Sequence, residues 1–453
     1  MRTGLVILGA VGATLLLAAP AARAQVSDAR RLGMGGILLS DDRQSAIQNV
    51  AYRAVPRTND PTESYKSIPL PLGLIQVLAN PPEFDPKNPN FNVFQTIALI
   101  SRTPYTLQLI KPEELSSDII VDVGQDQLVV NLGDLQSLFP SGGSKIGTTL
   151  ATPNLEFGTA NIFGGVRPQS EARNTLNLDP TLQAALAEAA PFEPNTIYGA
   201  NDDAQAQAAL AFMLGGALPL MPPTDAPDGN PRKGGKAIYG GVRAKYLRGI
   251  ALWRGQGSAQ FATGDTIFGS STPIETQYDV NVRQTPNPGF GEGNGFGADA
   301  GVVFFVDRLE VGIGVNDIAA TIDWKDTDVD NFTYDSVNNV NVKTPVSRGE
   351  SYKSRFPTTG SFNMVYRTKT ITFGGTLDLT ANQLWVPRVG METWLGPTPL
   401  RGGLYVGAYS RLQFTAGSGI KIGKIGLDLA LATHSRGLTD KRGLELAASL
   451  AIY

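Results

Sequence analysis

The last third of the chain alternates apolar residues with polar or small residues at a period of two. From Arg308 onward, five segments carry apolar side chains at alternate positions, interrupted only at Gly375 and Ser418, with Gly, Ala, Ser, Thr or charged residues between them: 309–315, 371–379, 414–422, 425–431 and 444–452. Successive side chains of a strand point to opposite faces, so this pattern predicts β-strands with one apolar face. The stretches 306–310, 367–371 and 422–426 leave room only for hairpin turns.

The same criterion predicts further strands in the rest of the chain. They are expected at 155–166, 211–221, 236–249, 250–263, 275–283, 296–306, 332–342, 361–368, 389–395 and 404–411. Residues 323–355 otherwise form a long polar connection. The region 80–150 is less regular, with a loop at 80–90 and a hairpin formed by 118–123 and 127–131. A short helix is expected further on, around 182–186.

Two kinds of β protein fit this pattern: a soluble sandwich and a membrane-spanning barrel. The polar face is rich in Gly, Ala, Ser and Thr, strands run to roughly ten residues, and short connections alternate with long ones, as is typical of an outer-membrane barrel. Closure of such a barrel satisfies every backbone group in lipid. The sequence therefore predicts an all-β fold, a transmembrane antiparallel β-barrel of about 14 strands, with 12–16 as the range. A soluble periplasmic or surface β protein is the alternative.

Residues 1–24 are predicted to be a cleaved signal peptide. Arg2 gives a positive start, residues 5–19 form an apolar run, and Ala22-Arg23-Ala24 fits the small-x-small cleavage pattern. The run is shorter than the ~20 apolar residues of a spanning helix, which argues against a membrane anchor. The chain contains no Cys, which excludes disulfides, thiolate metal sites and a lipid-anchored lipoprotein.

Charge and isolated motifs exclude several function classes. Lys and Arg number 38 against 41 acidic residues, so no basic surface for nucleic acid is indicated. His434 is the only histidine, and no G-x-S-x-G motif accompanies it, so we expect no enzyme and no cofactor. Asp326, Asp328 and Asp330 have the spacing of a calcium loop but lack its Gly and Glu, so a solvated charge run is expected, with a loose divalent site in an outer loop as the alternative.

The stretch "ARRLGMGGILLSDDRQSAIQNVAYR" (29–53) resembles the start of mature proteins in the outer-membrane long-chain fatty-acid transporter superfamily. This group includes FadL-like proteins, the related porin of type IX secretion and TraF-like conjugal-transfer proteins. The matching residues are Gly33, Met34, Gly35, Gly36, Asp41 and Asp42, and Asn49-Val50-Ala51 stands where that group has Asn-Pro-Ala. The segments 240–249, 295–318 and 386–407 also look like barrel strands of this group.

The resemblance implies that residues 25–60 fold back into the barrel lumen as a hatch, or plug, and that residues 61–453 form the barrel, with an irregular insertion around 80–150. Glycines suit a segment whose backbone passes close to the wall. Asp41 and Asp42 would meet the polar wall, and Met34, Ile37 and Leu38 would line an apolar pocket. The alternative is an ordinary first strand with a Gly-rich turn.

The function implied is a passive outer-membrane channel for small hydrophobic, fatty-acid-like molecules, gated by this hatch. Its partners would be outer-membrane lipid and a small hydrophobic ligand. The alternative function is a non-transporting barrel that serves as a scaffold for a secretion or conjugation machine. In both the channel and the scaffold, the apolar face of each strand would meet lipid and the face with small residues would meet the lumen.

Overall fold

A computed structural model describes most of the chain from Asp28 to Ile452. The described residues are 28–42, 45–56, 66–70, 105–107, 120–123, 128–131, 144–151, 155–159, 161–188, 190–265, 275–286, 288–289, 291–335, 338, 340–379, 385–406, 412–433 and 444–452. The predicted signal peptide, the predicted loop at 80–90 and His434 lie outside these residues.

The described part of the chain is built mainly of strands. In chain order they are β1 (Lys66–Pro69), β2 (Tyr105–Leu107), β3 (Ile120–Val123), β4 (Leu128–Asn131), β5 (Ser144–Ala151), β6 (Leu155–Gly158), β7 (Ile162–Leu178), β8 (Ile197–Thr224), β9 (Lys236–Ala262), β10 (Glu275–Gln284), β11 (Gly293–Val306), β12 (Leu309–Asp335), β13 (Val340–Arg355), β14 (Thr359–Arg367), β15 (Ile371–Leu379), β16 (Trp385–Leu395), β17 (Thr398–Val406), β18 (Leu412–Ile422), β19 (Ile425–Thr433) and β20 (Leu444–Ile452).

Eighteen of these strands form one sheet, and all the pairings within it are antiparallel. At four positions of the sheet, two strands lie end to end along the same neighbouring strand. They are β1 and β2 along β20, β5 and β6 along β7, β10 and β11 between β9 and β12, and β13 and β14 along β12. The eighteen strands therefore occupy 14 positions across the sheet. The predictions of an all-β fold and of about 14 strands are confirmed.

Short connections gather at one end of the sheet, which we call the turn end. The hairpins β11–β12, β16–β17 and β18–β19 turn through Asp307, Gly396 and Gly423, whose φ angles are 54°, 62° and 62°. Positive φ at the first turn position matches the twist of the flanking strands. The hairpins predicted at 306–310, 367–371 and 422–426 are confirmed.

The two faces of the strands differ as the alternation predicts. The apolar side chains exposed on β14 to β19 show 37–73% of their surface, whereas the alternate side chains point inward and are mostly buried. On β19, for example, Leu429 is 47% exposed and Ala430 is 2% exposed. The inner face carries the small and charged residues, so the polar–apolar phase of these strands is confirmed.

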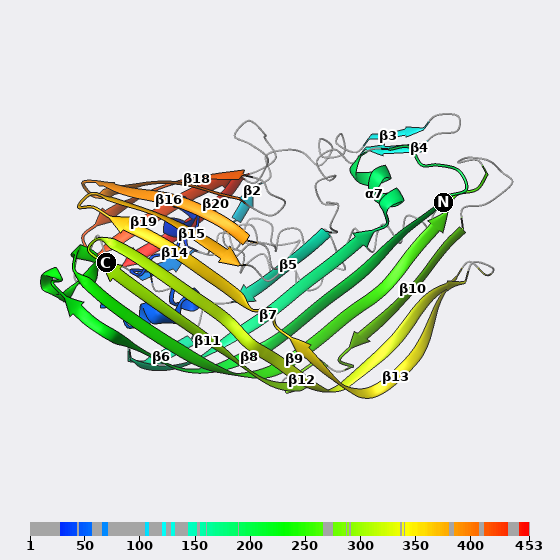
Figure 1. Cartoon of the computed structure of the whole chain (residues 1–453), viewed down its shortest axis with the longest axis horizontal. Coiled ribbons are helices and arrows are strands. Elements are labelled where there is room, and N and C mark those ends of the chain that lie inside the picture. The colour runs from blue at the N-terminus through cyan, green and yellow to red at the C-terminus, as the bar shows by residue number, and fades with distance from the viewer. Residues whose placement is uncertain are drawn as a thin grey trace, which may run out of the picture.

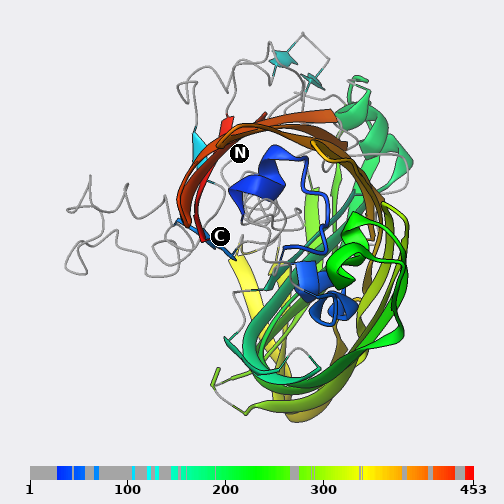
Figure 2. The same ribbon diagram turned by 90° about the vertical axis from the view of Figure 1, so that its left-hand side faces the viewer.

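The sheet curls around the N-terminal part of the chain (Figure 2). The strands β14 to β20 are short, whereas β7, β8, β9, β10, β12 and β13 run on past them away from the turn end (Figure 1). No pairing joins β1 or β2 to β5 or β6 within the described ranges.

Some predicted strand boundaries are wrong. The two strands expected at 236–249 and 250–263 are the single strand β9, in which Ile250 forms a bulge opposite Ala208 and Ala209. An extra residue shifts the side-chain phase, and that shift looks like a boundary in the sequence. The predicted strand 155–166 is instead the β6–β7 hairpin, and the predicted strand 211–221 is the second half of the longer strand β8.

The polar connection predicted at 323–355 is also wrong, because most of it belongs to β12 and β13. The side chains of β13 are exposed on both faces along most of its length. A strand that is exposed to solvent on both faces does not need alternating apolar residues, so its sequence lacks the pattern from which strands are predicted.

Helical elements are few and short. They are α2 (Ala29–Gly33), α3 (Ser45–Gln48), the 3-10 turn η2 (Val50–Arg53), α7 (Pro180–Ala187), and the 3-10 turns η6 (Pro227–Gly229) and η7 (Pro231–Lys233). The helix predicted around 182–186 is α7, and the hairpin predicted at 118–131 is β3 paired with β4. No described helix has both the length and the apolar character to cross a membrane.

Candidate functional site

The N-terminal segment, residues 28–56, lies inside the curve of the sheet (Figure 2). All the residues from Asp28 to Asp42 are buried. Its first half, with α2, packs on β17 to β20, and its second half, with α3 and η2, packs on β8, β9, β11 and β12. No strand runs through its described residues, so the alternative of an ordinary first strand is wrong.

A stripe of three glycines on neighbouring strands receives the first half of the segment. Gly390 and Gly403 lie opposite each other on β16 and β17, and Gly417 follows on β18. A Cβ atom at Gly390 or Gly403 would overlap the backbone of Met34 and Gly35, and one at Gly33 would lie 3.0 Å from Gly417 Cα. The wall therefore admits the segment only because these positions carry no side chain.

A second glycine stripe receives the other half. Gly241, Gly301 and Gly314 lie side by side on β9, β11 and β12. A Cβ atom at any of them would come against the backbone or side chains of residues 48–51. Asn49 is fixed there, since its Nδ2 donates to Val302 O at 3.1 Å and its Oδ1 caps Ala51 N at 3.1 Å.

Hydroxyl groups of the wall bind the backbone of the first half. Ala29 N donates to Ser449 Oγ at 2.9 Å, Gly35 N to Thr415 Oγ1 at 3.0 Å, and Leu38 N to Thr376 Oγ1 at 3.0 Å. Gly35 and Leu38 lie in the loop after α2, which forms no strand, so these hydroxyls satisfy backbone donors that would otherwise be buried without a partner. Gly35 and Gly36 adopt φ angles of 68° and 84°, which favour glycine.

Arg30 connects the segment to a chain of buried charges on the wall. Its Nη2 and Nε lie 2.7 and 3.0 Å from the two carboxylate oxygens of Glu392, and its Nη1 lies 2.9 Å from Asp41 Oδ2. Glu392 also accepts from Arg401 Nε at 2.7 Å, and Arg401 Nη1 reaches Asp428 Oδ1 at 2.6 Å. The chain thus runs from the segment across β16, β17 and β19.

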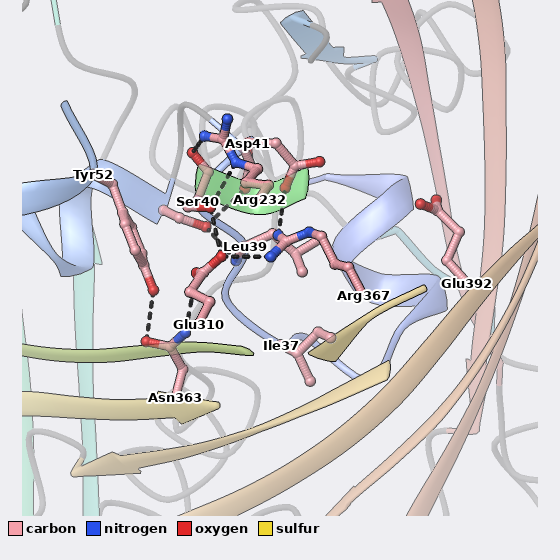
Figure 3. A network of polar contacts seen from close by, with 12 residues as sticks. Ile37, Leu39, Ser40, Asp41, Tyr52, Arg232, Glu310, Asn363, Arg367 and Glu392 are labelled. Atoms are coloured by element: carbon pink, nitrogen blue, oxygen red, sulfur yellow. Dashed lines mark hydrogen bonds and ion pairs between the residues drawn. The ribbon is translucent and has the colours of Figure 1, made fainter. Parts of the chain in front are cut away.

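A second group of polar contacts centres on Glu310 (Figure 3). Its Oε2 accepts from Ser40 Oγ at 2.6 Å and from Arg367 Nη1 at 2.6 Å. Arg367 Nη2 lies 3.4 Å from Asp41 Oδ1, which joins this group to the first one. Tyr52 OH donates to Asn363 Oδ1 at 2.6 Å beside it.

Asp41 is held ionised by the cations around it. Its complete burial acts to raise the pKa, but Arg30, Arg367 and Arg232 outweigh that effect and lower the pKa to about 2. Burial of a charge is tolerated only when it is paired in this way. The junction between the two halves of the segment is therefore held by charge as well as by packing.

Apolar side chains of the segment pack directly on the wall. Met34, Ile37 and Leu39 form a cluster with Val365 of β14. Leu38 lies in another cluster with Tyr52 and with wall residues that include Tyr239 and Phe305. Met34 and Leu38 are fully buried in these clusters, and their predicted role in lining a ligand pocket stays a prediction.

Two further layers follow on the inner face beyond the segment, away from the turn end. The first is an ion-pair layer in which Lys245 Nζ lies 2.6 Å from Asp299 Oδ1 and 2.8 Å from Asp317 Oδ1. Arg243 pairs with the same Asp299 at 2.6 Å, and its Nη2 donates to Ile47 O at 3.1 Å. The second layer is an apolar cluster: Ala209, Ala211, Met213, Leu247, Leu252, Ala320, Ile322, Trp324 and Phe356.

The predicted site residues all fall within the buried segment. They are Gly33, Met34, Gly35, Gly36, Leu38, Asp41, Asp42, Asn49 and Ala51. Asp41 meets the wall at Arg367 of β14 and also pairs with Arg30 of the segment, whereas Asp42 lies 3.8 Å from Arg31 of the segment itself, and its predicted contact with the wall stays a prediction.

Sequence reasoning missed the basic residues of the segment and their acidic partners on the wall. Arg30 and Arg31 stand in the quoted opening stretch, and Glu310 and Glu392 occupy the inner phase of strands. The available signal was that Glu310 and Glu392 are charged residues at strand positions predicted to face the lumen. Arg232 carried no such signal, because it lies in a connection.

The aspartates considered as a divalent site lie on β12, and two of them have cationic partners. Asp330 pairs with Arg348 and with Lys343, and Asp328 lies 3.6 Å from Arg348. In the part of the chain that the structure describes, no group of three or more His, Cys, Asp or Glu side chains is placed to hold a metal ion.

No protein-family model and no curated protein sequence matches the chain. The solved structure of the toluene transporter TbuX from Ralstonia pickettii is similar over 68% of this chain and 86% of its own, at 11% identity and a TM-score of 0.30. The toluene transporter TodX from Pseudomonas putida is similar over 70% of this chain and 88% of its own, at 8% identity and a TM-score of 0.24. A porin of Rh. blastica is similar over 57% of this chain and 99% of its own, at 7% identity and a TM-score of 0.20.

Proposed function

We propose that this protein is an outer-membrane β-barrel whose lumen is closed by residues 28–56, and that movement of this segment lets small hydrophobic molecules pass. The observation that carries the proposal is the burial of that segment against separate parts of the inner wall. Its described residues form no strand, so it can leave without breaking one.

The outer face of the sheet supports a membrane location. Exposed Phe, Leu, Ile and Met side chains cover the short strands, as with Phe373 at 55%, Leu429 at 47% and Ile422 at 73%. Soluble monomers rarely expose apolar patches larger than a few hundred Å². An apolar band of this kind is what the lipid face of an outer-membrane barrel presents.

An apolar layer on the inner face of β9 supports a hydrophobic solute. From the end opposite the turns, the inner face presents Arg254, which pairs with Asp203 at 3.1 Å, then Leu252 and Leu247, then Lys245 and Arg243, and then the closing segment at Gly241. A solute entering there meets an apolar layer that lies between two charged ones. The substrate class rests on this apolar layer and on the sequence resemblance.

A second candidate function is a non-transporting barrel that acts as a scaffold. The observation that favours it is the filled interior: Leu247, Ile322 and Phe356 are 0% exposed and Trp324 is 1% exposed. A wall whose inner side chains pack on one another leaves little room for a solute without rearrangement.

Removal of residues 26–52 separates the two candidates. The truncated chain should insert into outer membranes and migrate anomalously on gels unless boiled, because its strands lie elsewhere. Its conductance in planar bilayers should rise sharply above that of the full chain, and its binding of a fluorescent fatty acid should weaken. A folded truncation with unchanged conductance would support the scaffold, and a truncation that cannot fold would make the segment a structural element.

A further inference from the structure

Arg232 reaches the closing segment from the β8–β9 connection, residues 225–235. This connection lies at the turn end and is long compared with the hairpins beside it. Residues 227–229 are exposed, whereas Asn230, Pro231 and Arg232 are buried. Asn230 Oδ1 accepts from Arg232 N at 3.1 Å and so fixes the turn that carries the side chain inward.

The guanidinium of Arg232 binds the segment at two places. Its Nε donates to Ser40 Oγ at 2.9 Å and its Nη2 to Ser40 O at 2.9 Å. Its Nη1 donates to Pro56 O at 2.7 Å. Ser40 joins the two halves of the segment and Pro56 stands at its end, so one side chain fixes both points (Figure 3 shows the contact with Ser40).

The contact with Ser40 also completes the charge network. Ser40 Oγ accepts from Arg232 and donates to Glu310 Oε2, which fixes the direction of its hydroxyl. Arg232 is among the cations that lower the pKa of Asp41, the neighbouring residue. Loss of Arg232 therefore weakens the junction in two ways: the hydrogen bonds go, and Asp41 loses a counter-charge.

We infer that Arg232 is the latch of the closing segment, a positioning residue through which the β8–β9 connection controls opening. The inference rests on the proposed function and adds its regulation. The exposed part of the connection faces the compartment at the turn end, so a displacement of that loop withdraws the guanidinium and frees the junction at Ser40. The strands themselves do not have to move.

The test is single-channel recording of the full chain with Arg232→Gln, with Lys233→Gln as the matched control in the same connection. A net hydrogen bond from a charged group is worth about 1.5–3 kcal/mol, so the open-to-closed ratio should rise roughly tenfold to hundredfold. Lys233 pairs with exposed Asp228, and its variant should keep the ratio unchanged. Arg232→Lys keeps the charge but not the planar fork, and should give a smaller rise.

A disulfide separates opening from general damage. Ala29 and Ser449 are neighbours, with Ala29 N 2.9 Å from Ser449 Oγ, and the chain has no native Cys. With Ala29→Cys and Ser449→Cys added, oxidation should close the Arg232→Gln channel and reductant should reopen it.

An unchanged open-to-closed ratio in Arg232→Gln, or in Arg232→Lys if the first variant fails to fold, would overturn the latch. If the 26–52 truncation conducts in that case, the proposed function stands and only the latch is wrong. If the truncation is also silent, the proposed function fails as well.

Discussion

Arg30 and Glu392, 362 positions apart in the chain, form a two-point ion pair, with Nη2 2.7 Å from Oε1 and Nε 3.0 Å from Oε2. Both side chains are 2% exposed. A guanidinium that meets a carboxylate at two points gains geometric specificity as well as energy. The pair therefore determines where the first residues of the N-terminal segment lie on the wall.

Glu392→Gln should loosen that end. Arg30 and Arg401 would both lose a buried carboxylate, and breaking a buried pair by removing one partner costs about 3–5 kcal/mol. We expect more frequent channel openings and faster proteolysis within residues 28–42, with the folded band of unboiled samples unchanged on gels. Glu350→Gln, at a half-exposed partner of Arg283, is the control and should change neither readout.

Adjacent glycines on β17 offer a second test. A Cβ atom at Gly403 would overlap Gly35, whereas one at Gly402 would meet nothing within 4 Å. Gly403→Val should displace the segment and raise conductance, and Gly402→Val should behave like the parent chain. Equal conductance in the two variants would mean that the segment does not depend on the glycine stripe.

Substitutions on the two faces of β19 should have different effects, one on stability in the membrane and the other on the position of the N-terminal segment. Arg at Leu429, which is 47% exposed on the outer face, should cost about 2–4 kcal/mol of stability near the bilayer midplane. Arg at Ala430, which packs against Ala29 and Leu32, should leave insertion intact and displace the segment. Urea unfolding in lipid vesicles measures the first effect and conductance the second. Comparable unfolding midpoints for the two variants would contradict a lipid-facing outer surface.

Asp41 predicts the response of the channel to pH. Its pKa falls from the usual 3.8 to about 2 in the folded protein, so its stabilising charge is fully present above about pH 4 and is lost as the pH falls toward 2. The open fraction should stay constant between about pH 5 and 8 and rise below about pH 4. Asp41→Asn should open more often throughout and lose the acid-induced rise. A rise between pH 6 and 8 would assign the control to another group.

The short strands could be predicted from the sequence because their two faces meet different surroundings. On β19, leucines at 427, 429 and 431 face outward while Asp428 and Ala430 face the interior, so the alternation in the sequence is enough to predict the strand and its two faces. The same reasoning fails on β13, where Lys343 and Thr344 are both exposed. Solvent on both faces imposes no alternation.

The candidate site was only half accessible to sequence reasoning. The glycines and aspartates of the opening stretch indicated a segment that packs against a wall, but not which wall residues it would meet. Those partners depend on sheet register, which places Gly390 beside Gly403 and Gly241 beside Gly301. Arg232 was missed because its role comes from the path of a connection, and no periodicity marks that path.

Closure of the lumen by residues 28–56 is tested most directly by holding the segment in place and then releasing it. The chain with Ala29→Cys and Ser449→Cys, otherwise unchanged, should show no openings in planar bilayers while the disulfide is intact. Reductant added during the same recording should restore them, and the single-substitution variants should be indifferent to it. Openings that persist at full size with the disulfide formed would show that solutes take another route, and closure by this segment would then be wrong.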